Sequence, residues 1–200
     1  TGVQTCALPI YCGIGTISLF LAGKAAKVVG IESVESAISD ARRNAALNGI
    51  EQTEFHVGKV EQLMPALHAD GVSADVVVMH PPRKGCDEAT LSAVVRMAPR
   101  RVVYVSCNPA TAARDAAWLE QNGYHAEKVQ PVDLFPRTKH CECVIALSKG
   151  EIDSRKVRVE FSLEGMDTSG LQKGATYPEI KARVLEQTGL KVSSLYISQV

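Results

Sequence analysis

The sequence lacks long apolar runs, an excess of charge of either sign, and any C-x-x-C pair. No apolar stretch approaches the ~18 residues that a membrane span needs, and none follows a basic start as in a secretion signal. The formal net charge is +0 at pH 7, which argues against a chain that holds nucleic acid by bulk charge alone. We therefore expect a cytoplasmic protein with no membrane contact, on which a local basic face remains possible.

Cysteine is present, but not in the spacing of a small disulfide framework, so reduced thiols are expected. The six residues are Cys6, Cys12, Cys86, Cys107, Cys141 and Cys143. His140, Cys141 and Cys143 together suggest a metal, but the absence of C-x-x-C anywhere in the chain argues against a zinc site. We expect no metal.

Two hundred residues, 46% of them hydrophobic and 22% charged, fit one globular domain with a small appendage. Residues 1–10 (TGVQTCALPI) resemble the translation of a common sequencing adapter. Pro9 lacks the N–H that a buried central strand ending near Tyr11 would use. We therefore expect residues 1–10 to be non-native and outside the fold, and the native N-terminal part to be missing.

Residues 11–150 alternate short apolar runs with helical patterns. Strands are predicted at residues 27–31, 55–57, 74–79, 101–106 and 141–147, and helices at 17–22, 36–47 and 109–121. This alternation predicts an α/β fold, with a mostly parallel twisted sheet and helices on both faces. Ligands in such sheets bind beyond the carboxyl ends of the strands, and every polar motif below falls at such an end.

Residues 151–200 differ in character and are predicted to form a small α/β extension. Residues 157–163 alternate polar and apolar side chains like an exposed strand, and residues 177–187 form a helical pattern that Gly189 ends. A second helix beginning near residue 193 fits a truncated helix-turn-helix, or equally an ordinary helical hairpin.

The first polar motif is Tyr11-Cys12-Gly13-Ile14-Gly15-Thr16. Two glycines let the backbone approach a ligand closely, although a G-x-G pair without a third glycine also fits a plain strand-to-helix turn. Glu32 ends the next strand, sixteen residues after Thr16. A carboxylate at that place can accept both ribose hydroxyls of a nucleoside cofactor, which favours a binding loop over a simple turn.

Two further motifs follow strands. In residues 80–85 (HPPRKG), two prolines fix the backbone as the chain leaves the sheet, and Arg83 with Lys84 could meet phosphate or simply be solvated. Cys107 precedes Asn108-Pro109, and proline is favoured at a first helical position. A thiol beside the positive end of a helix is a plausible nucleophile, although an isolated cysteine is more often a small buried thiol.

The last motif is FPRTKHCEC, residues 135–143, which leads into the final strand. Within it, Glu142 alternates with Cys141 and Cys143, so its side chain lies on the opposite face from theirs. A carboxylate between apolar neighbours is costly unless it is paired or functional. We therefore expect Glu142 to be either paired or functional.

Together these motifs resemble the RNA (uracil-5-)-methyltransferase family, the enzymes of bacterial 23S ribosomal RNA and transfer RNA. The resemblance runs from residue 11 to about residue 149 and rests on YCGIGT, HPPRKGCD, VYVSCNPAT and FPRTKHCE. It implies a Rossmann-like class I methyltransferase fold and the cofactor S-adenosylmethionine. It also implies methyl transfer to carbon 5 of uridine in RNA, with ribosomal RNA expected ahead of transfer RNA, by a monomer.

By position, the resemblance makes Cys107 the nucleophile that adds to carbon 6 and Glu142 the base that removes the carbon 5 proton. It assigns substrate contacts to Arg83 and His140, and cofactor contacts to Tyr11, Gly13, Gly15, Thr16, Glu32, Lys59 and His80. Lys59 stands where the family often has an acidic or amide residue, and His80 replaces its usual aspartate. The family's cofactor-contacting glutamine, OB-type RNA-binding domain and iron–sulfur cysteines lie upstream of the matched region.

Two rival hypotheses remain at this point. The chain could be a methyltransferase of another substrate class, with residues 80–83 (HPPR) acting as an amino-methylation motif. In that case Cys107 is dispensable and the methyl group is found on nitrogen. It could instead be an inactive fragment, or a binding module that acts through its C-terminal helices, and then it does not bind S-adenosylmethionine.

Overall fold

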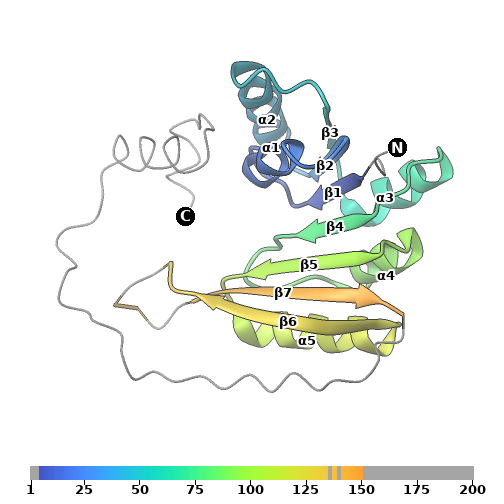
Figure 1. Cartoon of the computed structure of the whole chain (residues 1–200), viewed down its shortest axis with the longest axis vertical. Coiled ribbons are helices and arrows are strands. Elements are labelled where there is room, and N and C mark those ends of the chain that lie inside the picture. The colour runs from blue at the N-terminus through green and yellow to red at the C-terminus, as the bar shows by residue number, and fades with distance from the viewer. Residues whose placement is uncertain (1–4, 135–136, 139–140, 151–200) are drawn as a thin grey trace.

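The computed structural model describes residues 5–134, 137–138 and 141–150, and the described part contains a seven-stranded sheet in the order β3-β2-β1-β4-β5-β7-β6 (Figure 1). β1 to β5 are parallel, whereas β7 is antiparallel to both β5 and β6. The strands are β1 Cys6–Ile10, β2 Lys27–Glu32, β3 Thr53–Val57, β4 Val76–Met79, β5 Arg101–Ser106, β6 Tyr124–Val132 and β7 Glu142–Lys149. The predicted mostly parallel sheet is confirmed.

Helices cover both faces of the sheet, as predicted (Figure 1). They are α1 Thr16–Ala22, α2 Glu35–Leu47, α3 Val60–Ala69, α4 Glu88–Met97 and α5 Pro109–Gln121. The period-2 alternation of the strands divides the core between the faces. Leu8 and Val29 belong to the large cluster formed with α3, α4 and α5, whereas Ala7 and Val28, one position earlier, belong to a cluster with Ala22 of α1.

The expectation that residues 1–10 lie outside the fold is wrong for Cys6–Ile10, which form the central strand β1 between β2 and β4. Pro9 is buried there and pairs with Val78 of β4. The register with β2 runs through Cys6, Ala7 and Ile10 but skips Leu8 and Pro9. A proline in this strand therefore interrupts pairing on one side only, and burial of its neighbours outweighs that loss. The adapter origin of these residues stays a prediction.

Three elements were not predicted from the sequence: α3, α4 and β6. Pro65 lies inside α3 and weakened the helical pattern. The start of α4 carried a recognisable signal, since Asp87 caps it by accepting a hydrogen bond from the Thr90 backbone N–H at 2.8 Å. The predicted extension at residues 151–200 lies outside the described residues. No helix in the described ranges has the length and apolar character to cross a membrane.

One edge of the sheet gathers the polar motifs. The carboxyl ends of β1, β2, β4 and β5 meet there because these strands are parallel. β7 runs the other way, so its first residue, Glu142, arrives at the same edge. Because β7 is antiparallel, the fourth motif lies at the same edge of the sheet as the other three.

Candidate active site at the carboxyl edge of the sheet

The loop after β1 is held tightly against β2. The Cys12 N–H donates to the Ile31 carbonyl at 3.1 Å, and the Gly13 N–H donates to Glu32 Oε2 at 3.1 Å. Gly15 has φ +86°, and a Cβ there would lie 3.1 Å from the Ala41 Cβ. Glycine is thus required at position 15 of the predicted turn, both by the backbone conformation and by close packing against α2.

Glu32 is fixed at the end of β2 by its own neighbours. Its Oε1 accepts from the Ser33 N–H at 2.7 Å, from the Ser33 hydroxyl at 3.1 Å and from the Val34 N–H at 3.0 Å. With the bond from Gly13, four donors orient this carboxylate. Oε2 keeps an acceptor position for a ligand hydroxyl.

Thr16 offers a polar atom that nothing in the described residues satisfies. Its Oγ1 is buried and has no hydrogen-bond partner there, and a buried hydroxyl left unpaired is costly. A ligand that reaches the glycine turn would remove this cost.

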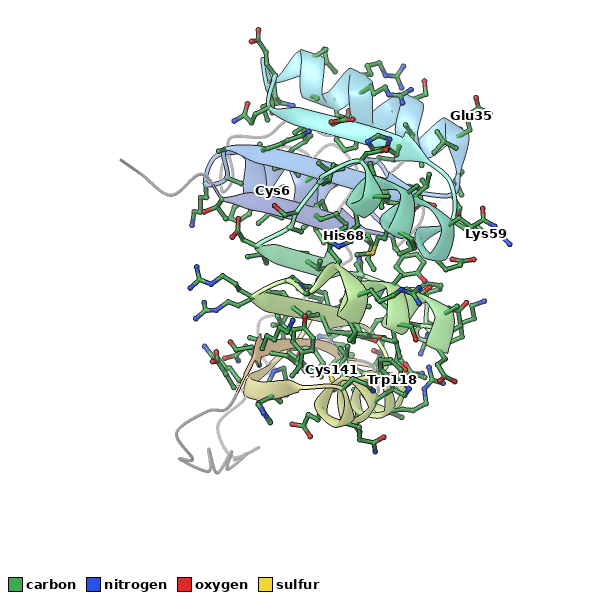
Figure 2. All side chains as sticks on the ribbon, turned by 90° about the vertical axis from the view of Figure 1, so that its right-hand side faces the viewer. Cys6, Glu35, Lys59, His68, Trp118 and Cys141 are labelled. Carbon is green, nitrogen blue, oxygen red and sulfur yellow. The ribbon has the colours of Figure 1, made fainter. Side chains whose placement is uncertain are left out.

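A cavity of about 450 Å³ opens beside this loop. Four of the predicted cofactor residues line it, namely Tyr11, Glu32, Lys59 and His80, whereas Gly13, Gly15 and Thr16 are not among its lining residues. Figure 2 shows Lys59 at the edge of the molecule where the chain leaves β3. Ser33, Gly58 and Asp87 also line the cavity and were not predicted from the sequence.

A larger cavity of about 600 Å³ lies at the opposite edge of the sheet, between Thr5, Asp75, Arg100, Arg101 and Lys149. These residues flank the amino ends of β1, β4 and β5 and the end of β7. We assign the ligand to the smaller cavity, because open α/β sheets bind ligands beyond the carboxyl ends of their strands.

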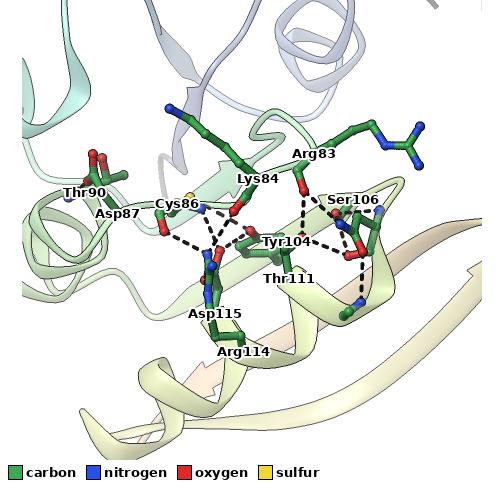
Figure 3. A network of polar contacts seen from close by, with 12 residues as sticks. Arg83, Lys84, Cys86, Asp87, Thr90, Tyr104, Ser106, Thr111, Arg114 and Asp115 are labelled. Carbon is green, nitrogen blue, oxygen red and sulfur yellow. Dashed lines mark hydrogen bonds and ion pairs between the residues drawn. The ribbon is translucent and has the colours of Figure 1, made fainter.

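The loop between β4 and α4 is anchored to α5 through Asp115 (Figure 3). Asp115 is 1% exposed and accepts hydrogen bonds from the Tyr104 hydroxyl and, at 2.7 Å, from the Cys86 N–H. Arg114 forms an ion pair with Asp115 at 2.7 Å and donates to the Lys84 carbonyl at 3.1 Å. Asp115 shares the buried stripe of α5 with Ala112, Ala116 and Leu119, so an acidic residue in an apolar stripe was a sequence signal that the prediction overlooked.

The same loop also meets the beginning of α5. The Arg83 carbonyl accepts from Asn108 Nδ2 at 3.0 Å and from the Thr111 hydroxyl at 3.1 Å. Gly85 has φ +78°, and a Cβ there would lie 2.5 Å from Arg114 Nη2. The HPPRKG loop and the helix after Cys107 therefore form one hydrogen-bonded unit.

Cys107 lies in the bend between β5 and α5 and is half-buried. Asn108 caps α5, accepting from the Ala110 N–H at 3.2 Å, and Pro109 is the first helical residue, as predicted. The Asn108 N–H in turn donates to the Ser106 hydroxyl at 3.0 Å. These bonds on either side fix the backbone that carries the thiol.

Glu142 begins β7 directly opposite this bend. Ser106 pairs with Cys143 in the antiparallel register, and Cys107 and Glu142 are the next residues along the two segments. Glu142 is 7% exposed, its Oε1 has no hydrogen-bond partner among the described residues, and burial raises its pKa. Cys143 faces the core, in keeping with the predicted alternation.

His80 joins the cavity to Glu142. Its Nε2 lies 3.6 Å from Glu142 Oε1, although its own side chain is 42% exposed, and burial lowers its pKa. His140 lies outside the described residues, so its predicted substrate contact stays a prediction, as does that of Arg83. Within residues 5–134, 137–138 and 141–150, no group of three or more His, Cys, Asp or Glu side chains could hold a metal ion.

Comparisons with known proteins identify the family of the chain. A family model described as tRNA (Uracil-5-)-methyltransferase matches residues 2–150. An uncharacterized RNA methyltransferase of Bacillus cereus is 59% identical over 141 residues, which make up 70% of this chain and 31% of that protein. One from Halalkalibacterium halodurans is 58% identical over 147 residues, 74% of this chain and 32% of that protein. The chain spans about a third of the length of these relatives.

A solved structure is similar as well. The tRNA (uracil-54, C5)-methyltransferase of Pyrococcus abyssi, in complex with S-adenosyl-L-homocysteine, matches with a TM-score of 0.61 and 35% sequence identity. The match covers 74% of this chain and 34% of that one.

Proposed function

The chain belongs to the tRNA (uracil-5-)-methyltransferase family, and from that premise we propose that it forms the catalytic domain of an enzyme that transfers a methyl group from S-adenosylmethionine to carbon 5 of uridine in RNA. The expected Rossmann-like class I methyltransferase fold is confirmed by the mixed sheet and its solved neighbours. The observation that carries the proposal is the β5–β7 register, in which Ser106 pairs with Cys143 and the next residues along the two segments are Cys107 and Glu142.

The cavity at the carboxyl edge fits the cofactor. Glu32 presents a carboxylate oxygen for ribose hydroxyls, and the unpaired Thr16 hydroxyl lies on the glycine turn. When bound, S-adenosylmethionine supplies an electrophilic methyl group. We assign the cofactor contacts to Tyr11, Gly13, Gly15, Thr16, Glu32, Lys59 and His80.

The chain's own residues do the covalent work. Carbon 5 of uracil is a poor nucleophile, and addition of the Cys107 thiolate to carbon 6 turns the ring into an enolate whose carbon 5 can accept a methyl group. Glu142 then removes the carbon 5 proton. The electron pair of that C–H bond forms the carbon 5–carbon 6 double bond, and the thiolate leaves. Burial of Glu142, which raises its pKa, suits a base that must hold this proton briefly.

Access to Cys107 requires the target base to be splayed out of any stack. We propose a uridine of ribosomal RNA ahead of one in transfer RNA, contacted by Arg83 and His140, and an enzyme that works as a cytoplasmic monomer. Methylation of the two RNA classes, purified from cells lacking the gene, distinguishes them by the RNA that incorporates labelled methyl groups.

Trapping tests the mechanism. RNA containing 5-fluorouridine cannot lose a proton from carbon 5, so the complete protein encoded by the gene should form an adduct that survives denaturation. Cys107→Ala should form none. Cys6→Ala, at the opposite edge of the sheet, should react like the unaltered protein. Methylation that persists in Cys107→Ala, or a methyl group found on nitrogen, would reject the proposal in favour of another methyltransferase class. Absence of S-adenosylmethionine binding by calorimetry would indicate an inactive domain.

A further inference from the structure

Glu142 must lose the proton that it takes from the substrate before it can act again. Its side chain is 9% exposed, and the described residues provide no hydrogen-bond partner for Oε1. A bound RNA would cover this edge further. Direct release of the proton to bulk water is therefore hindered, and a neighbouring group that reaches both Oε1 and water would carry it away.

His80 is placed to be that group. It follows the last residue of β4, and its Nε2 lies 3.6 Å from Glu142 Oε1, across the carboxyl end of β5. Its ring is 42% exposed, so one end of the imidazole meets the buried carboxyl while the ring also reaches solvent. Neutral imidazole accepts a proton at one nitrogen and can release one to water.

Burial also brings the two groups closer in acidity. It raises the pKa of Glu142 and lowers that of His80. A smaller difference between the two pKa values lowers the uphill cost of moving a proton between the groups in either direction. An ion pair of fixed charges would instead hold the proton on the histidine.

We propose that His80 is the proton-relay residue of the site, and this inference rests on the proposed function. Glu142 takes the carbon 5 proton as the carbon 6–sulfur bond breaks and the Cys107 thiolate leaves. The protonated carboxyl then closes the 3.6 Å contact to a hydrogen bond and gives its proton to His80 Nε2. The imidazolium releases a proton to water, which restores the neutral ring and the carboxylate.

The experiment separates methyl transfer from adduct breakdown. The complete protein encoded by the gene reacts with uridine-containing RNA and S-adenosylmethionine labelled on the methyl group, at saturating cofactor. In His80→Ala, multiple turnover should fall roughly 10²-fold and labelled adduct should accumulate after the first turnover, a larger effect than any change in single-turnover methyl transfer. His80→Gln keeps the size but not the basicity and should behave like His80→Ala. His68→Ala, on α3, is the matched control and should behave like the unaltered protein.

Chemical rescue distinguishes proton transfer from a structural role. Added imidazole should restore adduct breakdown in His80→Ala, since the exposed ring position is open to solvent. Failure of rescue, or breakdown at the unaltered rate in either variant after the first turnover, overturns the relay. If the unaltered protein forms no adduct with 5-fluorouridine RNA, the proposed function itself fails. If it forms the adduct and the His80 variants turn over normally, only the relay fails.

Discussion

The two halves of the carboxyl edge are built in opposite ways. On the β2 side, four hydrogen bonds hold Glu32, and the turn before α1 is packed closely against α2. On the β7 side, Glu142 is buried with an unpaired oxygen, and His80 Nε2, at 3.6 Å from it, stays beyond hydrogen-bond distance. The Glu32 carboxylate is oriented before a ligand arrives, whereas the Glu142 carboxylate keeps an unsatisfied oxygen.

This difference indicates a division of labour. A binding surface gains affinity when its polar groups are already oriented, because little ordering remains to be done. A general base gains reactivity when burial keeps its pKa raised and no partner ties it down. A substitution on the β2 side should therefore change stability and activity in the same direction. A substitution on the β7 side should lower activity while it raises stability.

Glu142→Gln should show this opposition most strongly. Turnover should fall by roughly 10²–10⁴-fold, because the base is lost. The pKa of Glu142 is raised in the fold, so its contribution to stability is present below the unfolded value of 4.5 and is lost as pH rises through the folded pKa. A neutral amide avoids that loss. The variant should therefore be the more stable protein by urea unfolding at about pH 7, and this advantage should fade at about pH 4.

Glu51→Gln, in an exposed loop, is the control for this change and should alter neither turnover nor stability. If Glu142→Gln had a lower free energy of unfolding than the unaltered protein at neutral pH, the carboxylate would be satisfied in the fold. The proposed difference between the two sides would then be wrong.

Gly85→Ala should disturb the loop that connects the two sides. The new Cβ meets Arg114 Nη2 at 2.5 Å and Asp115 Oδ2 at 2.6 Å, at φ +78°. Overpacking and backbone strain together predict a loss of about 2–4 kcal/mol in chemical unfolding. Gly71→Ala, at φ +87° with nothing within 4 Å, isolates the strain and should cost only about 1 kcal/mol. Equal losses in the two variants would mean that the Asp115 anchor does not restrain the loop.

Glu32→Gln should weaken cofactor binding. Unlike Glu142→Gln, it should not make the protein more stable. The amide keeps the shape but removes the charged acceptor that the Gly13 and Ser33 donors orient. Hydrogen bonds to charged groups contribute about 1.5–3 kcal/mol, so the Kd for S-adenosylmethionine by calorimetry should rise roughly 10–100-fold. Glu35→Gln, exposed at the start of α2, should leave the Kd unchanged. An unchanged Kd in Glu32→Gln would place the ribose elsewhere.

Asp87→Ala should have the smallest effect, a loss of about 1 kcal/mol, from removal of the α4 cap. The hydrogen bond from the Thr90 backbone N–H lowers the pKa of Asp87. Its contribution is therefore present above the unfolded value of 3.8 and is lost as pH falls through the folded pKa. Thermal unfolding of Asp87→Ala and the unaltered chain should converge in acid, whereas Asp87→Asn should keep a cap that does not titrate.

Much of the fold could be predicted from periodicity alone. The strand Arg101–Ser106 and the helix Pro109–Gln121 have the predicted bounds, because an unbroken apolar run and a proline at the first helical position are unambiguous signals. Pro9 led to the wrong prediction for the strand Cys6–Ile10. The local propensity of proline does not show that only the pairing with β2 is interrupted. β6 was missed because its alternating residues are mostly half-exposed and carry a weak apolar pattern.

The candidate site divides in the same way. The glycine turn, Glu32, Cys107 and Glu142 were recognisable as residue types at strand ends, whereas Asp115 was overlooked within α5. The contact between His80 and Glu142 joins positions sixty-two residues apart in the chain, and no local pattern predicts such a pair.

The residues themselves determined which strands are buried, where the helices begin, and which side chains could act as nucleophile, base or ribose acceptor, because these properties follow from local spacing and chemistry. Tertiary structure alone decided that β7 runs antiparallel, that Glu142 therefore lies at the edge of the sheet where Cys107 follows β5, and that its Oε1 is left beside an exposed imidazole. Strand direction and burial depend on the whole sheet packing at once, and that long-range choice turns separate motifs into one site.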